Sequence, residues 1–363
     1  MSKLSLYNDA FLTQMRQQMD PLADQAVAAM YQHPAGGTFR ETIATLTTND
    51  YVIPDDLPAE VTHFLEQSRT LPNWADERLL RRGHDFFARQ TPELLIMLGL
   101  LSLPYDYAAA DGAQVLYLSE RLRNDPGKRL AETGQYVLDV GSKDAFGPRG
   151  KAICSAQKVR LIHAAIRYHL LKDDRWNFDW GQPVNQEDMA GTNLSMSLLP
   201  VRGMRELGIR VASEDQLAYV HRWNVASHLM GVDERLLPDT GKEAFWLIKL
   251  ISERHHRPSE AGRGLTKSLL TYLQQNTPSN LSALASAYMR LLLGDAVADI
   301  LDLPASTLPP KLLASPLQGL NGLRSLIGFQ TGTYQATRQR LQQEIKRQRA
   351  DTFRTPERLG SSS

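Results

Sequence analysis

Cysteine is nearly absent from this sequence of 363 residues, which contains only Cys154. A single thiol cannot form an intramolecular disulfide, and it excludes a zinc or iron–sulfur site built from several cysteines. A lone cysteine is typical of a protein from a reducing compartment. Any metal would therefore be held mainly by histidine, carboxylate or an organic cofactor.

Net charge and long apolar runs are also lacking. Lysine and arginine total 41 against 40 acidic residues, a formal net charge of +1, which gives no electrostatic reason to expect nucleic acid as a partner. The N-terminal segment is charged throughout and has no apolar core of a secretory signal. The longest apolar run, 94–103, is about half of what a bilayer span needs. We expect no integral membrane segment and a cytoplasmic location.

Strand-like alternation is scarce, whereas apolar residues recur at helical spacing along most of the chain. There is no internal repeat and no long linker, so we expect an all-α fold. We divide it into an N-terminal helical extension (1–74), a core domain (75–330) and a charged C-terminal helix and tail (331–363). A break near Pro200 is left open. The predicted helices are 12–22, 75–88, 92–101, 113–122, 127–139, 156–171, 187–207, 215–230, 241–253, 262–275, 279–293, 316–327 and 333–349.

The most informative motif is Arg160-x-x-His163-x-x-x-Arg167. On an α-helix these three side chains share one face. Two guanidiniums disfavour protonation of the histidine between them, and metals bind the neutral ring. His163 can therefore hold haem iron while Arg160 and Arg167 pair with the haem propionates. The same spacing equally fits a core histidine flanked by two arginines in ordinary salt bridges.

This motif resembles the signature of the latex clearing proteins and the wider MpaB-type oxygenase family, in which the histidine is the proximal ligand of haem b. A second match lies upstream, because Arg129 and Thr133 precede His163 by 34 and 30 residues, as the family pattern requires. The segments 186–192 and 219–232 are similar to later parts of the family. The resemblance covers roughly residues 75–235.

The resemblance implies a globin-like helical core around haem b, with additional N- and C-terminal helices. It also implies an oxygenase that cleaves carbon–carbon double bonds of an isoprenoid or other lipophilic alkene with dioxygen, giving carbonyl products. The partners would be a small lipophilic substrate and dioxygen. An intracellular location favours a short prenyl chain over bulk polymer.

Within this resemblance, Arg129, Glu132 and Thr133 are the expected catalytic residues on the distal side of the haem. Rubber-cleaving members have a lysine at the position of Glu132, which can cap the iron. With Glu132 the sixth iron site would be open or filled by water, and the carboxylate can act as a general base. A surface carboxylate paired with Lys128 or Arg129 is the alternative for Glu132.

Two further histidines, His221 and His228, lie seven residues apart and share a helix face. We expect His228 to line the cofactor pocket. In a rival interpretation, both join His163 and a carboxylate, Asp188 or Glu187, in a non-haem metal site. A third interpretation is a non-catalytic helical protein that binds haem or a hydrophobic ligand. The sequence does not determine the oligomeric state.

Overall fold

The computed structural model describes residues 2–33, 37–119, 126–275 and 282–305, with short pieces at 335–336, 338–339 and 342–343. Within these ranges the chain consists of helices and loops, and its one β-type contact is an isolated bridge between Ala109 and His256. The predicted all-α fold is confirmed. The elements are η1 (Lys3–Ser5), α1 (Asp9–Arg16), α2 (Pro21–Gln32), α3 (Thr38–Thr45), α4 (Ala59–Gln67), α5 (Glu77–Met97), η2 (Leu98–Ser102), α6 (Leu103–Tyr107), α7 (Gly112–Leu118), α9 (Pro126–Gly141), α10 (Ala152–Leu170), η3 (Phe178–Trp180), α11 (Gln186–Glu206), α12 (Ser213–Leu229), η4 (Glu234–Leu236), α13 (Gly241–His255), α14 (Glu260–Gln275), α15 (Ser282–Leu293) and α16 (Asp295–Ile300).

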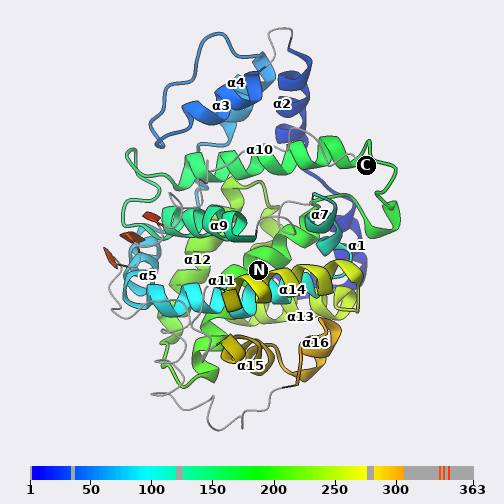
Figure 1. Ribbon diagram of the computed structural model, residues 1–363. Coiled ribbons are helices and arrows are strands. Elements are labelled where there is room, and N and C mark those ends of the chain that lie inside the picture. The colour runs from blue at the N-terminus through cyan, green and yellow to red at the C-terminus, as the bar shows by residue number, and fades with distance from the viewer. Residues whose placement is uncertain are drawn as a thin grey trace.

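The helices are arranged in layers along the molecule (Figure 1). The helices α2, α3 and α4 lie at one end, and the long helix α10 runs across the molecule beside them. The helices α5, α11 and α12 pack against one another in the middle, with α13 and α14 alongside. The helices α15 and α16 pack together at the opposite end. This arrangement places the faces of α9, α10, α11 and α12 around one interior region.

The helix starts follow from local capping chemistry. Asn185 begins α11 by accepting a hydrogen bond from the Asp188 backbone N–H at 2.9 Å. Thr240 and Glu243 form a reciprocal capping box at the start of α13. Asp20 caps α2, whose first residue is Pro21. Here the sequence pattern was misleading, because the predicted helix 12–22 is divided into α1 and α2 by this cap.

Proline inside helices has two different outcomes. Pro200 lies inside α11 without ending it. A proline at position 200 leaves the Met196 carbonyl without its helical donor, and the hydroxyl of Tyr219 donates to this carbonyl at 3.4 Å. Pro92 lies within α5, which is distorted at Gln90 (φ −119°, ψ 18°). The predicted helices 75–88 and 92–101 are therefore parts of one bent helix that continues into the π-helical turn η2.

Within the described residues, one helical stretch is long and apolar enough to cross a membrane, namely Glu77–Tyr107. Its best window has a mean hydropathy of 1.2, and 67% of that window is buried inside the protein. Such burial is what a core helix shows, since α5 packs against α12 and α11. The stretch by itself gives no support to a membrane span.

Some sequence predictions lie outside the described residues. These are the helix 316–327, nearly all of the helix 333–349 and, with it, the C-terminal unit 331–363. The helix predicted for 113–122 is described as far as Leu118. The boundaries 1–74 and 75–330 stay predictions, although α1 and α2 of the N-terminal extension pack directly on α11 and α10.

Candidate functional site

A cavity of about 260 Å³ lies among α6, α7, α9, α10, α11, α12 and α13. Leucine, isoleucine, valine and methionine make up 15 of its 33 lining residues, alanine, tyrosine and tryptophan add further apolar surface, and polar groups stand among them. An apolar cavity with a few convergent polar groups is the usual form of a small-molecule site. Its polar and charged lining residues include Asp106, Arg129, Glu132, Thr133, His163 and Asp188.

His163 of α10 faces this cavity. Its Nδ1 is buried without a hydrogen-bond partner in the described chain, its Nε2 makes no hydrogen bond with a described residue either, and the half-buried side chain lines the cavity. Burial, together with the nearby guanidiniums of Arg167 and Arg129, lowers the pKa of His163 to about 3. The ring is therefore neutral near pH 7, which is the form that coordinates a metal.

Arg129, Glu132 and Thr133 of α9 line the same cavity, as expected. Nη1 of Arg129 lies 3.5 Å from Oε2 of Glu132, and the Thr133 hydroxyl donates to the Arg129 carbonyl at 3.0 Å. Glu132 is 4% exposed, so it is not a surface carboxylate. Its Oε1 is buried and has no hydrogen-bond partner among the described residues. Such an atom is expensive to bury unless a ligand pairs with it.

Arg160 and Arg167 lie on the face of α10 that meets α2. Arg160 donates to both oxygens of Asp20, at 2.5 and 2.8 Å, and Arg167 donates to Asp24 at 2.6 Å. These ion pairs are the ordinary salt bridges that the sequence left open as an alternative. Arg160 does not line the cavity, and its remaining Nη1 is directed to the Leu229 carbonyl, so the propionate role predicted for Arg160 is corrected.

Arg167 does not line the cavity either, but its Nη2 is buried and has no hydrogen-bond partner in the described chain. His163, Glu132 and Arg167 thus each have an unpaired buried atom, as do Tyr107 and Asn193 of the cavity wall. A neutral nitrogen ligand, an unpaired guanidinium nitrogen and an apolar lining are the groups that a haem with its acidic propionates requires. The residues present fit that cofactor.

His228 is not among the residues that line the cavity. Its Nδ1 lies 3.1 Å from the Glu234 carboxylate and its ring packs edge-on against Trp74. The cavity side of α12 carries Trp223 and Ser227 instead. One residue further along an α-helix is a turn of about 100°, so His228 points elsewhere. The predicted contact of His228 with the cofactor is corrected.

The rival non-haem metal site is also not formed. His221 accepts a hydrogen bond from the Asp76 backbone at 3.0 Å and lies against Trp74, away from His163. Nowhere in the described part of the chain do three or more histidine, cysteine or acidic side chains gather as metal ligands. The carboxylates proposed for that site, Asp188 and Glu187, are paired with arginines instead.

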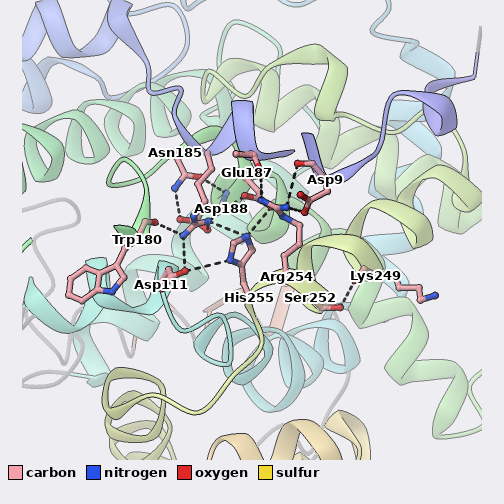
Figure 2. A network of polar contacts seen from close by, with 12 residues as sticks. Asp9, Asp111, Trp180, Asn185, Glu187, Asp188, Lys249, Ser252, Arg254 and His255 are labelled. Atoms are coloured by element: carbon pink, nitrogen blue, oxygen red, sulfur yellow. Dashed lines mark hydrogen bonds and ion pairs between the residues drawn. The ribbon is translucent and has the colours of Figure 1, made fainter. Parts of the chain in front are cut away.

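These arginine pairs belong to an ion-pair network beside the cavity, whose inner members are buried (Figure 2). Arg16 of α1 donates to Asp188 at 2.9 Å, and Arg254 donates to Glu187 at 2.7 Å. His255 lies between two carboxylates, with Nε2 3.0 Å from Glu187. The network fixes Asp188 in the cavity wall. Its members are Asp9, Arg16, Asp111, Glu187, Asp188, Arg254, His255 and Arg257.

Two further titratable residues, Asp106 and His256, line the cavity and were not predicted as site residues. Asp106 had a readable signal, because it is the only charged residue between Leu94 and Ala110. A single carboxyl in such an apolar stretch is expensive to bury and is often functional. His256 follows α13, where burial, together with neighbouring His255, lowers its pKa to about 4. Nothing in its local sequence distinguished it from a helix cap.

Comparison with known proteins gives concordant results. The family described as "ER-bound oxygenase mpaB/B'/Rubber oxygenase, catalytic domain" matches residues 94–318, more than half of the chain. A "Rubber oxygenase" of Streptomyces sp. (strain K30) is 29% identical over 299 residues, covering 82% of this chain and 73% of the relative.

A solved structure of latex clearing protein LCP in the closed state is also similar. It aligns with a TM-score of 0.74 and 27% identity, covering 92% of this chain and 90% of the other. The matched segment of the family includes α9, α10, α11 and α12, and hence His163 and its cavity. This chain belongs to the family of mpaB-type and rubber oxygenase catalytic domains.

Proposed function

We propose that this protein is a haem b-dependent oxygenase that cleaves carbon–carbon double bonds of a lipophilic alkene with dioxygen, giving carbonyl products. One observation carries the proposal: His163 presents a neutral, unpaired Nε2 to an apolar cavity inside the segment that matches the oxygenase family. The names of the relatives, rubber oxygenase and latex clearing protein, support an isoprenoid as the substrate class.

In this proposal Nε2 of His163 holds the iron. The unpaired Nη2 of Arg167 binds a propionate, while Arg160 positions α10 through its ion pair with Asp20. Arg129 and Thr133 shape the pocket from α9. The haem, when bound, would supply the activation of dioxygen, and the protein sets access and polarity.

The remaining chemistry falls to side chains of the cavity. Its leucine, isoleucine and valine side chains bind the hydrocarbon chain and exclude water. Glu132 is the candidate for a general base, because its Oε1 is buried and unpaired and the residue lines the cavity. It would accept a proton from the carbon next to the double bond. We also propose, as the sequence predicts, that the protein acts in the cytoplasm on a short prenyl chain.

The first test is a visible absorption spectrum of the purified protein, with and without dithionite, repeated for His163→Ala. We expect a Soret band that shifts on reduction and is lost or strongly altered in the variant. His228→Ala is the matched control, because His228 lies outside the cavity, and its spectrum should equal that of the parent protein.

Turnover is tested separately, by incubating the haem-loaded protein with short terpenoids under dioxygen and searching for new aldehydes or ketones. A featureless visible spectrum after expression with ample haem precursor would contradict the haem assignment. A normal Soret band without any carbonyl product would instead indicate the non-catalytic binding protein.

A further inference from the structure

Asp106 of α6 is a half-buried carboxyl group at the cavity wall. Within the described chain, no lysine, arginine or histidine forms an ion pair with it. This distinguishes it from Asp188, which is paired with Arg16, and from Glu132, which lies 3.5 Å from Arg129. Charging a carboxyl group at a largely apolar cavity wall without a counter-ion is unfavourable, which favours its neutral form.

The hydrogen bonds of Ser195 on α11 point to the same protonation state. Its Oγ lies 2.8 Å from Oδ2 of Asp106 and 2.9 Å from the carbonyl oxygen of Thr192. A serine hydroxyl has one hydrogen, so it cannot donate to both acceptors. If Asp106 carries a proton on Oδ2, it donates to Ser195, and Ser195 donates to Thr192. Each of the two hydrogens, that of Asp106 and that of Ser195, then has one acceptor.

The surroundings of Asp106 agree with this assignment. Burial raises the pKa of Asp106 to about 7, and the negative charge of Asp188 on α11 contributes to this rise. The hydrogen bond with Ser195 acts in the opposite direction but is the smaller effect. The other titratable groups beside it are Tyr105 and Tyr107 of its own helix. Burial, with a contribution from Asp106, raises the pKa of both phenols above the ordinary value, so neither becomes charged near pH 7.

The second carboxyl oxygen, Oδ1, makes no hydrogen bond with any described residue, and it is not sealed inside the protein. The accessible surface of the Asp106 side chain therefore opens onto the cavity. When Oδ2 carries the proton, Oδ1 is a carbonyl-type oxygen that can only accept. We propose that Asp106 is a neutral carboxylic acid whose Oδ1 binds the hydroxyl group of a lipophilic alcohol in this cavity.

This inference rests on the proposed function and narrows its substrate to an isoprenoid that carries a hydroxyl group. A hydrocarbon offers no donor for Oδ1 and would leave this oxygen without a partner. An ammonium group would also be a donor, but it would require Asp106 to be ionised. The two ligand chemistries are therefore distinguishable by experiment.

The test is isothermal titration calorimetry of the full-length protein with farnesol and with farnesyl methyl ether, at pH 6 and under nitrogen so that no turnover occurs. The two probes share one chain, and only the alcohol has a hydrogen to donate. We expect farnesol to bind about two- to tenfold more tightly, the range of one net hydrogen bond. Equal binding of both probes, or no binding of farnesol, would overturn the proposal.

Two variants test whether Asp106 is the residue that binds the hydroxyl group. Asp106→Asn should keep the preference for the alcohol, because its amide donates N–H to Ser195 and keeps a carbonyl oxygen toward the cavity. Asp106→Leu has a similar volume and no acceptor, so it should bind both probes equally. A preference that survives in Asp106→Leu would overturn the assignment, as would tighter binding of farnesylamine than of farnesol.

Infrared difference spectroscopy supplies a readout that needs no ligand. At pH 6 we expect a C=O stretching band of a protonated carboxylic acid that disappears in Asp106→Asn. Its absence from the parent protein would show that Asp106 is ionised. Neither measurement depends on a Soret band or on alkene cleavage, so a failure of the proposed function and a failure of this inference are seen separately.

Discussion

Arg160 of α10 holds Asp20, the capping residue of α2, with both Nε and Nη2, at 2.5 and 2.8 Å. The same carboxylate accepts the Ala23 backbone N–H at the start of α2. Asp20 and Arg160 are 4% and 9% exposed, so the pair is buried. One side chain thus starts a helix and attaches it to the helix that carries His163.

Asp20→Asn should separate these two roles. Asparagine keeps the capping acceptor but leaves Arg160 charged, buried and without its counter-ion, so we expect a loss of about 3–5 kcal/mol in the free energy of unfolding. Urea denaturation measures it. Asp173→Asn is the control, because Asp173 pairs with the half-exposed Arg175 and should change stability by less than about 1 kcal/mol. Equal stability of the two variants would show that the buried pair contributes little.

His255 should make stability depend on pH in the neutral range. Burial opposes protonation of His255, but the carboxylates of Asp111 and Glu187, 3.7 and 3.0 Å from its ring nitrogens, raise the pKa of His255 above its ordinary 6.5. Because the folded-state pKa is the raised one, this contribution is fully present below pH 6.5 and is lost as pH rises through the folded pKa. We expect the urea midpoint to fall over that range. In His255→Gln this part of the pH dependence should vanish, and an unchanged pH profile would contradict the assignment.

Gly141 ends α9 in contact with Phe87 of α5. A Cβ at position 141 would overlap the ring of Phe87, which is 1% exposed and cannot move aside into solvent. We expect Gly141→Ala to lower the free energy of unfolding by about 1–3 kcal/mol through overpacking. Gly99→Ala is the matched control, since a Cβ there meets no atom within 4 Å. Thermal unfolding of both variants checks this, and a neutral Gly141→Ala would mean that α9 and α5 can shift apart.

Glu132→Gln tests the general base. The amide keeps the size of the side chain and removes its ability to accept a proton, so we expect turnover to fall by about 10²–10⁴-fold. The Soret band should stay as in the parent protein, because His163 and Arg167 are unchanged. Product formation from a short terpenoid, normalised to haem content, is the measurement. Turnover within a factor of about two of the parent would exclude Glu132 as the base.

Helix identity could be predicted from the sequence wherever the signal is local. The predicted helices 127–139, 156–171 and 215–230 correspond closely to α9, α10 and α12. Periodicity of apolar residues and capping act within a few residues, so a single sequence carries them. The motif around His163 belongs to the same class, because its three members lie on one helix.

Whether the helix breaks at Pro200 could not be predicted in the same way. The Met196 carbonyl, which Pro200 leaves without its helical donor, accepts a hydrogen bond from the Tyr219 hydroxyl of the neighbouring helix α12, 23 residues away in sequence. The contact between Asp106 and Ser195, which is 89 residues away in sequence, likewise has no local signal. Such partners are brought together only by packing.

The sequence by itself determined that the chain is helical, that His163 stands between two arginines on one helix face, and which family it resembles. The tertiary structure decided what those side chains touch. In the folded protein Arg160 pairs with Asp20, which is 140 residues away in sequence, His228 lies outside the cavity, and Asp106 lies in the cavity wall. The physical reason is that helix formation depends on neighbours in sequence, whereas the partner and the charge state of a buried side chain depend on which helix packs against it.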